Sequence, residues 1–257
     1  MAYKVDADMF RGGMNILVYG PQGAGKTFFA GTAQDHKAMK DVLVLSIEGG
    51  LMTLASRGDI IAETIKSTAQ LEEMFWKLTE IEKYPEYANI KTVVIDSITE
   101  LQTVNLEGIV RESLGKRKDK TQDDVYQEDY GKSTTQLKRL LRYFRDLPLN
   151  VIYTALPKTV FSKSGEVVVS VEPMLTTKLS QSVMGYVDFV WYLYQQEVFD
   201  AEGKFERIDR YMLTRDSGVY RAKTRGVKFS EALGGKVRNP NLPGLYDLFI
   251  KSEGGTL

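Results

Sequence analysis

Residues 20–27 of the chain read Gly20-Pro21-Gln22-Gly23-Ala24-Gly25-Lys26-Thr27. This stretch has the spacing G-x-x-x-x-G-K-[ST], in which glycines allow the backbone to wrap closely around phosphate oxygens. An apolar run, residues 14–19, precedes it, and a segment of helical character, residues 26–34, follows. This strand–loop–helix context supports the motif. The sequence therefore predicts a phosphate-binding loop between a buried strand and a helix.

Each part of this loop has a chemical role. Successive backbone N–H groups can face phosphate oxygens, and the amino terminus of the following helix adds partial positive charge. Lys26 can reach the β- and γ-phosphates of a nucleoside triphosphate, and the hydroxyl of Thr27 can ligate Mg²⁺. We therefore expect this P-loop, or Walker A motif, to bind ATP and Mg²⁺ through all eight residues from Gly20 to Thr27. The alternative is a glycine-rich turn without a ligand.

Two carboxylates follow other buried strands. Asp96 ends the apolar run 92–95, where a P-loop protein needs an acid to hold Mg²⁺, although an Asp there can also simply cap the next helix. Ser97 follows Asp96, so the glutamate that many ATPases place there as a general base is absent. Glu48 stands where the run 41–47 ends, at the edge where open α/β sheets bind ligands. We expect Thr27 and Asp96 to hold the metal and Glu48 to orient water; the alternative for Glu48 is a solvated loop acid.

Strands and helices alternate along the first part of the chain. Buried strands are predicted at 14–19, 41–47, 92–96 and 150–154, a weaker strand at 60–65, and helices at 26–34, 70–83 and 98–114. This order predicts an α/β fold with a mostly parallel sheet and helices on both faces. Strand-like runs at 187–194, 211–214 and 219–224 predict mixed strands toward the carboxyl terminus. We expect one domain over 1–257, with a core at about 14–226, a helix at 241–251 and a tail at 252–257.

Two polar segments interrupt this alternation. Residues 115–129 carry many charges and few apolar side chains, which predicts a surface loop, and Ser133 is then expected to cap the next helix. Residues 158–171 form two strand-like runs around Ser164-Gly165, which predicts a β-hairpin.

Composition excludes several classes of function. The 257 residues contain 34 basic and 34 acidic side chains, so net charge does not attract the protein to polyanions. The chain has no cysteine, which excludes disulfides and zinc–thiolate sites. The single histidine, His36, is expected to be a solvated residue at a helix end. The first ten residues lack the apolar core of a signal peptide, and no apolar run reaches the roughly 20 residues that span a bilayer. We expect a cytoplasmic protein with no membrane partner.

Taken together, these motifs resemble the RecA-type recombinase core. The resemblance rests on the P-loop, on Glu48 after the next strand, on the pair Asp96-Ser97 and on a hairpin after a fourth strand. It covers about residues 15–225 and is closest to phage-encoded nucleotide-binding proteins, which include short RecA-like single-strand-annealing recombinases. The resemblance implies a RecA-like P-loop fold and an ATPase that acts in DNA recombination, in the host cytoplasm if the protein is phage-encoded.

The resemblance also implies partners. RecA-type proteins bind ATP between subunits of a ring or filament, and cations of a neighbour touch the γ-phosphate; Lys223 and Arg225 match that role. Their single-stranded DNA passes between two loops, which by position are 115–129 and 158–171, and DNA is expected to stimulate the ATPase. Lys158, Phe161 and Lys163 combine cations with an aromatic ring, a mixture that holds a single strand. The alternative is that these are ordinary solvated side chains.

The sequence departs from the RecA pattern at one position. The family places an amide side chain at the end of the fourth strand, where it couples the γ-phosphate to DNA, and Thr154 stands there instead. This difference favours binding or annealing of DNA over full strand exchange. It also leaves open a second function, an ATP-gated assembly module that recruits a partner and turns over slowly.

Overall fold

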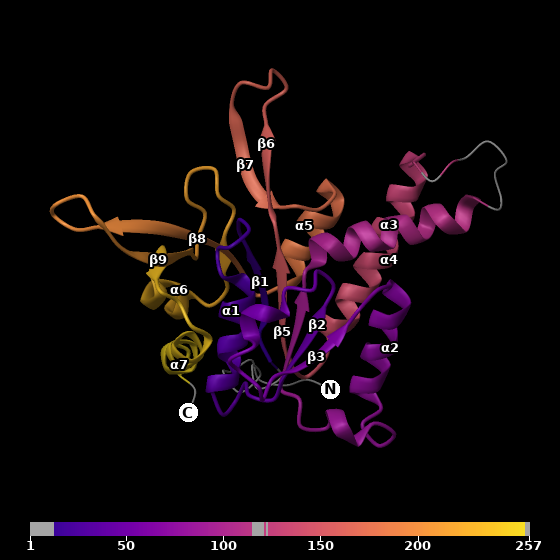
Figure 1. Cartoon of the computed structure of the whole chain (residues 1–257), viewed down its shortest axis with the longest axis horizontal. Helices are drawn as coiled ribbons and strands as arrows, with labels where there is room; N and C mark the ends of the chain where they lie inside the picture. Colours follow the sequence, from indigo (N-terminus) through magenta and orange to yellow (C-terminus); the bar gives the residue numbers. More distant parts are fainter. Residues whose placement is uncertain (1–12, 115–120, 122, 255–257) are drawn as a thin grey trace.

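The computed structural model describes residues 13–114, 121 and 123–254. Within this part, nine strands form one sheet in the order β11-β9-β8-β1-β5-β4-β2-β3, with β10 paired to β8 (Figure 1). The parallel part contains β1 (Asn15–Tyr19), β2 (Val42–Ser46), β3 (Ile61–Thr64), β4 (Thr92–Asp96), β5 (Asn150–Ala155) and β8 (Phe189–Phe199). The predicted α/β fold with a mostly parallel sheet is confirmed.

The later strands pair in antiparallel fashion, as the sequence predicts. β9 (Phe205–Leu213) pairs with β8 and with β11 (Lys236–Arg238), and the short β10 (Lys223–Thr224) pairs with β8. Strands β8 and β9 extend well beyond the predicted runs and form a hairpin that leaves the body of the molecule (Figure 1). The predicted hairpin at 158–171 is a separate two-stranded sheet, β6 (Pro157–Phe161) and β7 (Val168–Pro173).

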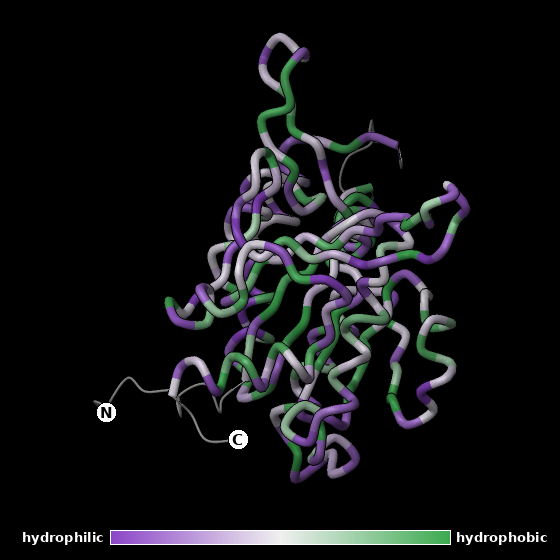
Figure 2. The backbone as a smooth tube through the Cα atoms, turned by 90° about the vertical axis from the view of Figure 1, so that its left-hand side faces the viewer, coloured by the Kyte–Doolittle hydropathy of each residue, from purple (hydrophilic) through white to green (hydrophobic). Residues whose placement is uncertain are grey.

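Helices cover both faces of the main sheet because each presents an apolar stripe to it. One face carries α2 (Thr68–Thr79), α3 (Ile98–Leu114), α4 (Gln127–Arg145) and α5 (Thr177–Tyr186), which share one buried cluster with the strands. The other face carries α1 (Lys26–Gly31), α6 (Val227–Leu233) and α7 (Leu242–Ser252), which share a second cluster. Figure 2 shows green, apolar chain running through the middle of the molecule between these layers.

Two helix boundaries differ from the sequence prediction. The helix after the P-loop ends at Gly31 and continues as a 3₁₀ turn, Thr32–Asp35. The prediction that Ser133 caps a helix is wrong: α4 begins at Gln127, and Ser133 lies fully buried inside it. The cause is Asp129, whose carboxylate accepts the backbone N–H of Tyr126 at 2.9 Å and so fixes an earlier start. The basic residues of the predicted loop at 115–120 lie outside the described residues.

The carboxyl-terminal helix packs next to the helix of the P-loop. The side chain of Asn241 accepts the backbone N–H of Gly244 at 2.9 Å and caps α7, near the predicted start at 241. His36 lies half-buried with its Nε2 3.0 Å from Asp247 Oδ1 on α7, so it is a packing contact and not the solvated residue expected. No helix in the described part is long and apolar enough to span a membrane.

Candidate nucleotide-binding site

The loop 20–27 leaves the carboxyl end of β1 and enters α1 under tight steric limits. A Cβ on Gly20 would lie 1.9 Å from the carbonyl oxygen of Leu193 on β8, so only glycine fits there. Gly25, at φ +92°, lies in the left-handed region that disfavours other residues. A Cβ there would also meet Arg210 Nε at 2.6 Å. The glycines of the motif are therefore required by the backbone path that exposes the loop amides.

Lys26 occupies the first position of α1, and its ammonium lies over the mouth of the loop. The Nζ donates to the carbonyl oxygens of Gly20 and Pro21, each at 2.9 Å. Burial lowers the pKa of Lys26 from its ordinary value, and the nearby carboxylates of Glu48 and Asp96 oppose that shift. A partly desolvated ammonium held by neutral carbonyls is well suited to pair with an arriving phosphate.

Asp96, at the end of β4, contacts both the first turn of α1 and strand β5. Its Oδ2 accepts the hydroxyl of Thr27 at 2.6 Å, and its Oδ1 accepts the hydroxyl of Thr154 at 2.5 Å. The carboxylate is only 6% exposed. The next helix is capped by a different residue, since Ser97 Oγ accepts the backbone N–H of Glu100 at 3.3 Å. These contacts favour the metal-side interpretation of Asp96 over the helix-cap interpretation.

Thr27 and Asp96 fit Mg²⁺. The ion prefers oxygen ligands and is usually bound through one or two protein groups together with substrate phosphates, keeping several waters. A hydroxyl and a carboxylate 2.6 Å apart beside the P-loop supply that donor set. Among the described residues no group of three or more acidic, histidine or cysteine side chains could hold a metal by itself, which agrees with an ion that arrives with its nucleotide.

Glu48 lies directly beside this carboxylate. The backbone N–H of Ile47 donates to the Asp96 carbonyl oxygen at 2.7 Å, so the end of β2 is fixed against the end of β4. The hydroxyl of Ser97 donates to Glu48 Oε1, and the rest of the Glu48 side chain faces solvent. The structure therefore brings Lys26, Thr27, Glu48 and Asp96 to one edge of the sheet, as the sequence predicts.

Comparison with known families agrees with this geometry. A family described as an AAA domain matches residues 12–226, which include the P-loop, Glu48 and Asp96. The chain belongs to this AAA domain family. Membership supports nucleotide binding and ATPase activity in general. No curated protein matches the chain.

Lys223 and Arg225 lie elsewhere in this AAA domain. Thr224, between them, pairs with Phe189 beside the amino end of β1, opposite the P-loop. Lys223 Nζ donates to the carbonyl oxygens of Met184 and Val187, at 2.5 and 2.8 Å. Arg225 binds the Asp188 carboxylate at 2.9 Å and the Gly185 carbonyl oxygen at 3.0 Å. Both cations therefore hold the end of α5 in their own chain, and their role in a neighbour's site stays a prediction.

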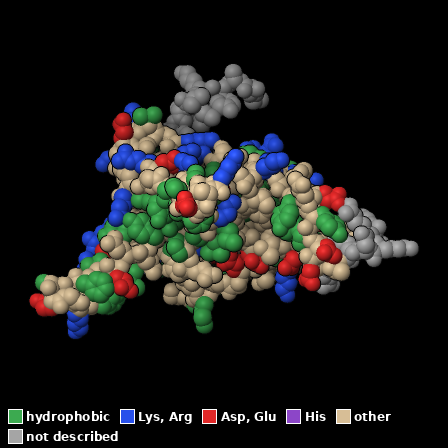
Figure 3. Space-filling model, turned by 90° about the horizontal axis from the view of Figure 1, so that it is seen from above, with side chains coloured by type: hydrophobic (Ala, Val, Ile, Leu, Met, Phe, Trp, Pro, Cys, Tyr) green, Lys and Arg blue, Asp and Glu red, His purple; other side chains and the backbone are tan. Residues whose placement is uncertain are grey.

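The three predicted DNA-binding residues lie on the β6–β7 hairpin, which projects from the body (Figure 1). Phe161 is 54% exposed, and Lys163 is exposed near the turn. Lys158 sits at the base of the hairpin, where its Nζ donates to the Leu175 carbonyl oxygen at 2.9 Å and lies 3.3 Å from Glu172 Oε1. Figure 3 shows apolar side chains gathered over this hairpin and at the β8–β9 tip. The hairpin thus has a polar turn, residues 162–166, with exposed apolar side chains on either side of it at Phe161, Val167 and Val169.

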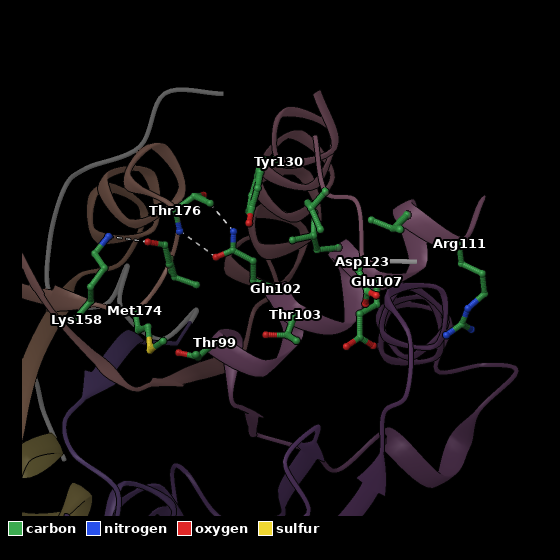
Figure 4. A pocket seen from close by; sticks show the side chains of 14 residues that line it. Thr99, Gln102, Thr103, Glu107, Arg111, Asp123, Tyr130, Lys158, Met174 and Thr176 are labelled. Atoms are coloured by element: carbon green, nitrogen blue, oxygen red, sulfur yellow. Dashed lines mark hydrogen bonds between the residues drawn. The ribbon is translucent and has the colours of Figure 1, made fainter. Parts of the chain in front are cut away.

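A cavity of about 640 Å³ lies between α3, the start of α4 and the segment before α5. On one wall Gln102 and Thr176 are joined twice: Gln102 Nε2 donates to Thr176 Oγ1 at 3.2 Å, and Thr176 N donates to Gln102 Oε1 at 3.0 Å (Figure 4). Lys158 and Arg111 lie at its ends, with Glu107 between them (Figure 4). The sequence did not predict this cavity, because its walls come from segments that lie far apart along the chain.

Two residues of the β8–β9 hairpin that contact the P-loop were also not predicted from the sequence. Gln195 Nε2 donates to the carbonyl oxygen of Gly23 at 2.8 Å, and Arg210 packs against Gly25. The signal was present in the turn-forming residues Asp200 and Gly203, which lie between two runs that contain aromatic and aliphatic side chains typical of strands.

Proposed function

We propose that the chain is an Mg²⁺-dependent ATPase that binds or anneals single-stranded DNA as an oligomer, in recombination or repair. One observation carries the ATPase part: the hydroxyl of Thr27 meets the carboxylate of Asp96 at 2.6 Å directly beside the P-loop. A hydroxyl and a carboxylate in contact at this place provide the protein's share of a magnesium–triphosphate site.

The residues of the site have different roles in the proposed hydrolysis. The loop amides and Lys26 hold the phosphates, and Thr27 and Asp96 would hold the Mg²⁺ that arrives with ATP, which would supply positive charge to those phosphates. Glu48 accepts the proton of the attacking water, since it is the exposed carboxylate next to Asp96. Ser97 positions Glu48 through its hydroxyl.

The same strands connect this site to the β6–β7 hairpin. Thr154, near the end of β5, donates to Asp96, and Leu156 N donates at 3.0 Å to Oγ1 of Thr99, the second residue of α3. Strand β6 begins at Pro157, immediately afterwards. Residues 154–156 therefore connect Asp96 to the hairpin, and through them ATP binding at Asp96 can shift the hairpin. Thr154 stands where RecA-type proteins have an amide.

Single-stranded DNA suits the projecting hairpin. Phe161 offers an exposed ring for a base, and Lys163 offers a cation for the backbone. Val167 and Val169, 61% and 51% exposed, add apolar surface to the same hairpin. Bases are apolar on their faces, so this hairpin fits stacking better than it fits duplex DNA.

The DNA part is tested with a labelled oligonucleotide and fluorescence anisotropy at low salt, with and without Mg-ATP. Phe161→Ala is expected to weaken binding by about 1–3 kcal/mol, the usual loss of one base stack. Phe199→Ala is the matched control, because Phe199 is 52% exposed at the tip of the other hairpin. Equal effects of the two variants, or indifference of wild-type protein to DNA, would overturn the proposal.

The oligomeric part has its own experiment. If Arg225 completes a neighbour's site, Arg225→Ala lowers ATPase activity, and mixing with Glu48→Gln subunits restores part of it. Each variant lacks a different half of a shared site, so some mixed interfaces carry both intact halves. If the ATPase activity of the mixture equals the sum of the activities of the two variants, Arg225 does not belong to a shared site.

The cavity beside α3 favours a second function, an ATP-gated module that recruits a partner. Its wall combines apolar residues with Glu107, Asp123, Arg111 and Lys158, a mixed charge that suits a peptide better than a phosphate backbone. ATPase activity measured against DNA concentration separates the two functions. A DNA-dependent increase supports the DNA role, and an unchanged rate supports the partner role.

A further inference from the structure

The β8–β9 hairpin forms a wall of the P-loop. Strand β8 runs parallel to β1 and continues past its end, so that Gln195 reaches the loop and donates to the Gly23 carbonyl oxygen at 2.8 Å. In the antiparallel pair, Gln195 stands opposite Arg210 on β9. The hairpin therefore places one amide and one guanidinium side by side over the loop.

The side chain of Arg210 packs directly against Gly25 of the loop. A Cβ on Gly25 would be 2.6 Å from its Nε and 3.2 Å from its Cδ, so the absence of a side chain at Gly25 makes room for it. Its guanidinium carbon lies 5.4 Å from the ring centre of Phe28, on the first turn of α1. The ring holds the guanidinium by a cation–π contact but supplies no counter-charge.

Within the described residues, this guanidinium has no anionic partner. Its Nε is buried and makes no hydrogen bond, and no ion pair involves Arg210. A buried donor without a partner costs free energy, and a charged one costs more. Arg210 as a whole is partly exposed, so an anion that reaches its guanidinium would supply the missing partner.

A second arginine shows what a purely structural role looks like at the same ring. Arg57 also lies over Phe28, at 5.7 Å from the ring centre. Its NH1, however, binds Asp35 Oδ1 at 2.5 Å, and the pairing raises the pKa of Arg57. Arg57 thus has its counter-charge within the protein, and Arg210 does not.

We propose that Arg210 binds a phosphate of the nucleotide in the P-loop of its own chain, on the nucleoside side of the phosphates. This inference rests on the proposed nucleotide site. Lys26 serves the β- and γ-phosphates. Gly25 and Phe28 border the start of α1, where the loop amides meet the phosphates nearer the nucleoside, and Arg210 packs on both. Arginine suits this task because its guanidinium binds phosphate oxygens in a fork geometry and stays charged.

The test compares Arg210→Gln with the matched control Arg57→Gln, using calorimetric titration with Mg-ATP and Mg-ADP. Arg210→Gln is expected to raise the Kd of both nucleotides by at least about tenfold, as loss of one charged hydrogen bond implies. Arg57→Gln is expected to change it by less than about threefold, and Arg210→Lys to lie between. Equal Kd values for wild type and Arg210→Gln would overturn the inference. Absence of Mg-ATP binding by the wild type would instead overturn the proposed function.

Two further readouts exclude a merely structural effect. The thermal midpoint of free Arg210→Gln is expected to match or exceed that of wild type, because an unpaired cation is removed, while its gain on adding Mg-ATP is smaller. In the wild-type protein, Mg-ATP is expected to protect Arg210, but not Arg57, from phenylglyoxal, as read by mass spectrometry. A lowered midpoint in the free variant, or modification of Arg210 unaffected by Mg-ATP, would contradict the proposal.

Discussion

Two pairs of cations lie at opposite ends of the sheet, and their partners differ. At the carboxyl end of β1, Lys26 donates to two carbonyl oxygens of the loop, with the carboxylates of Glu48 and Asp96 nearby, and Arg210 is without an anionic partner in the described part of the chain. At the amino end, Lys223 donates to two carbonyl oxygens at the end of α5, and Arg225 binds Asp188. The two lysines therefore have partners of the same kind, and the two arginines do not.

The difference teaches how to distinguish ligand-binding cations from structural ones. Spacing along a strand made Lys223 and Arg225 look equivalent to catalytic cations, since residues two apart share a face. The contacts separate the two arginines, because Arg225 loses its ion pair with Asp188 when it moves to a ligand. Arg210 has no ion pair within the described residues, so it has none to lose when a phosphate arrives.

The prediction with the largest expected effect compares the replacement of Lys26 with the replacement of Lys223. Lys26→Ala is expected to raise the Kd for Mg-ATP by about 100-fold or more, since it removes a charged contact to the phosphates. Calorimetric titration of each variant measures the effect. Lys223→Met is the control and is expected to bind Mg-ATP like wild type. Similar losses in both variants would break the comparison.

A second prediction concerns the carboxylate beside the site. Glu48→Gln is expected to lower the ATP turnover rate by about 100-fold to 1000-fold, because the amide cannot accept a proton from water. Binding of Mg-ATP is expected to be preserved, since the loop amides and Lys26, which hold the phosphates, are unchanged. Steady-state phosphate release and a nucleotide titration measure the two quantities. Wild-type turnover in this variant would remove Glu48 from the mechanism.

A third prediction concerns the structural cations. Lys223→Met is expected to lower the free energy of unfolding by about 1 kcal/mol, because two helix carbonyls at the end of α5 lose their donor. Urea denaturation measures the change. An unchanged unfolding free energy together with reduced ATPase activity would assign Lys223 to a shared catalytic site instead.

The smallest expected effect is a pH dependence. Burial lowers the pKa of Lys26, and only the charged ammonium binds phosphate, so the Kd for Mg-ATP rises as the pH increases through that lowered pKa. Lys26→Arg keeps its charge throughout and is expected to show a flatter profile of Kd against pH. Parallel profiles for the two proteins would show that another group controls binding.

The sequence predicted that Lys26, Thr27, Glu48 and Asp96 meet at one edge of the sheet, because the signals for these residues are local. The P-loop glycines, Asp96 and Glu48 each stand at the end of a buried strand, and parallel strands bring such ends to one edge. The contacts of Lys223 and Arg225 escaped prediction, because their partners lie on α5, some 40 residues away in the chain. Arg210 escaped it because the long β8–β9 hairpin, which carries it to the loop, continues past the apolar runs that marked its strands.

The most direct measurement of the central claim is calorimetric titration of the wild-type protein with Mg-ATP, beside Lys26→Ala. The claim is that backbone amides of 20–27, together with Lys26, bind a magnesium-loaded triphosphate. It predicts one site per chain in the wild type and a loss of the binding heat in the variant. Absence of heat with every magnesium-loaded triphosphate, or equal heat in both proteins, would contradict it.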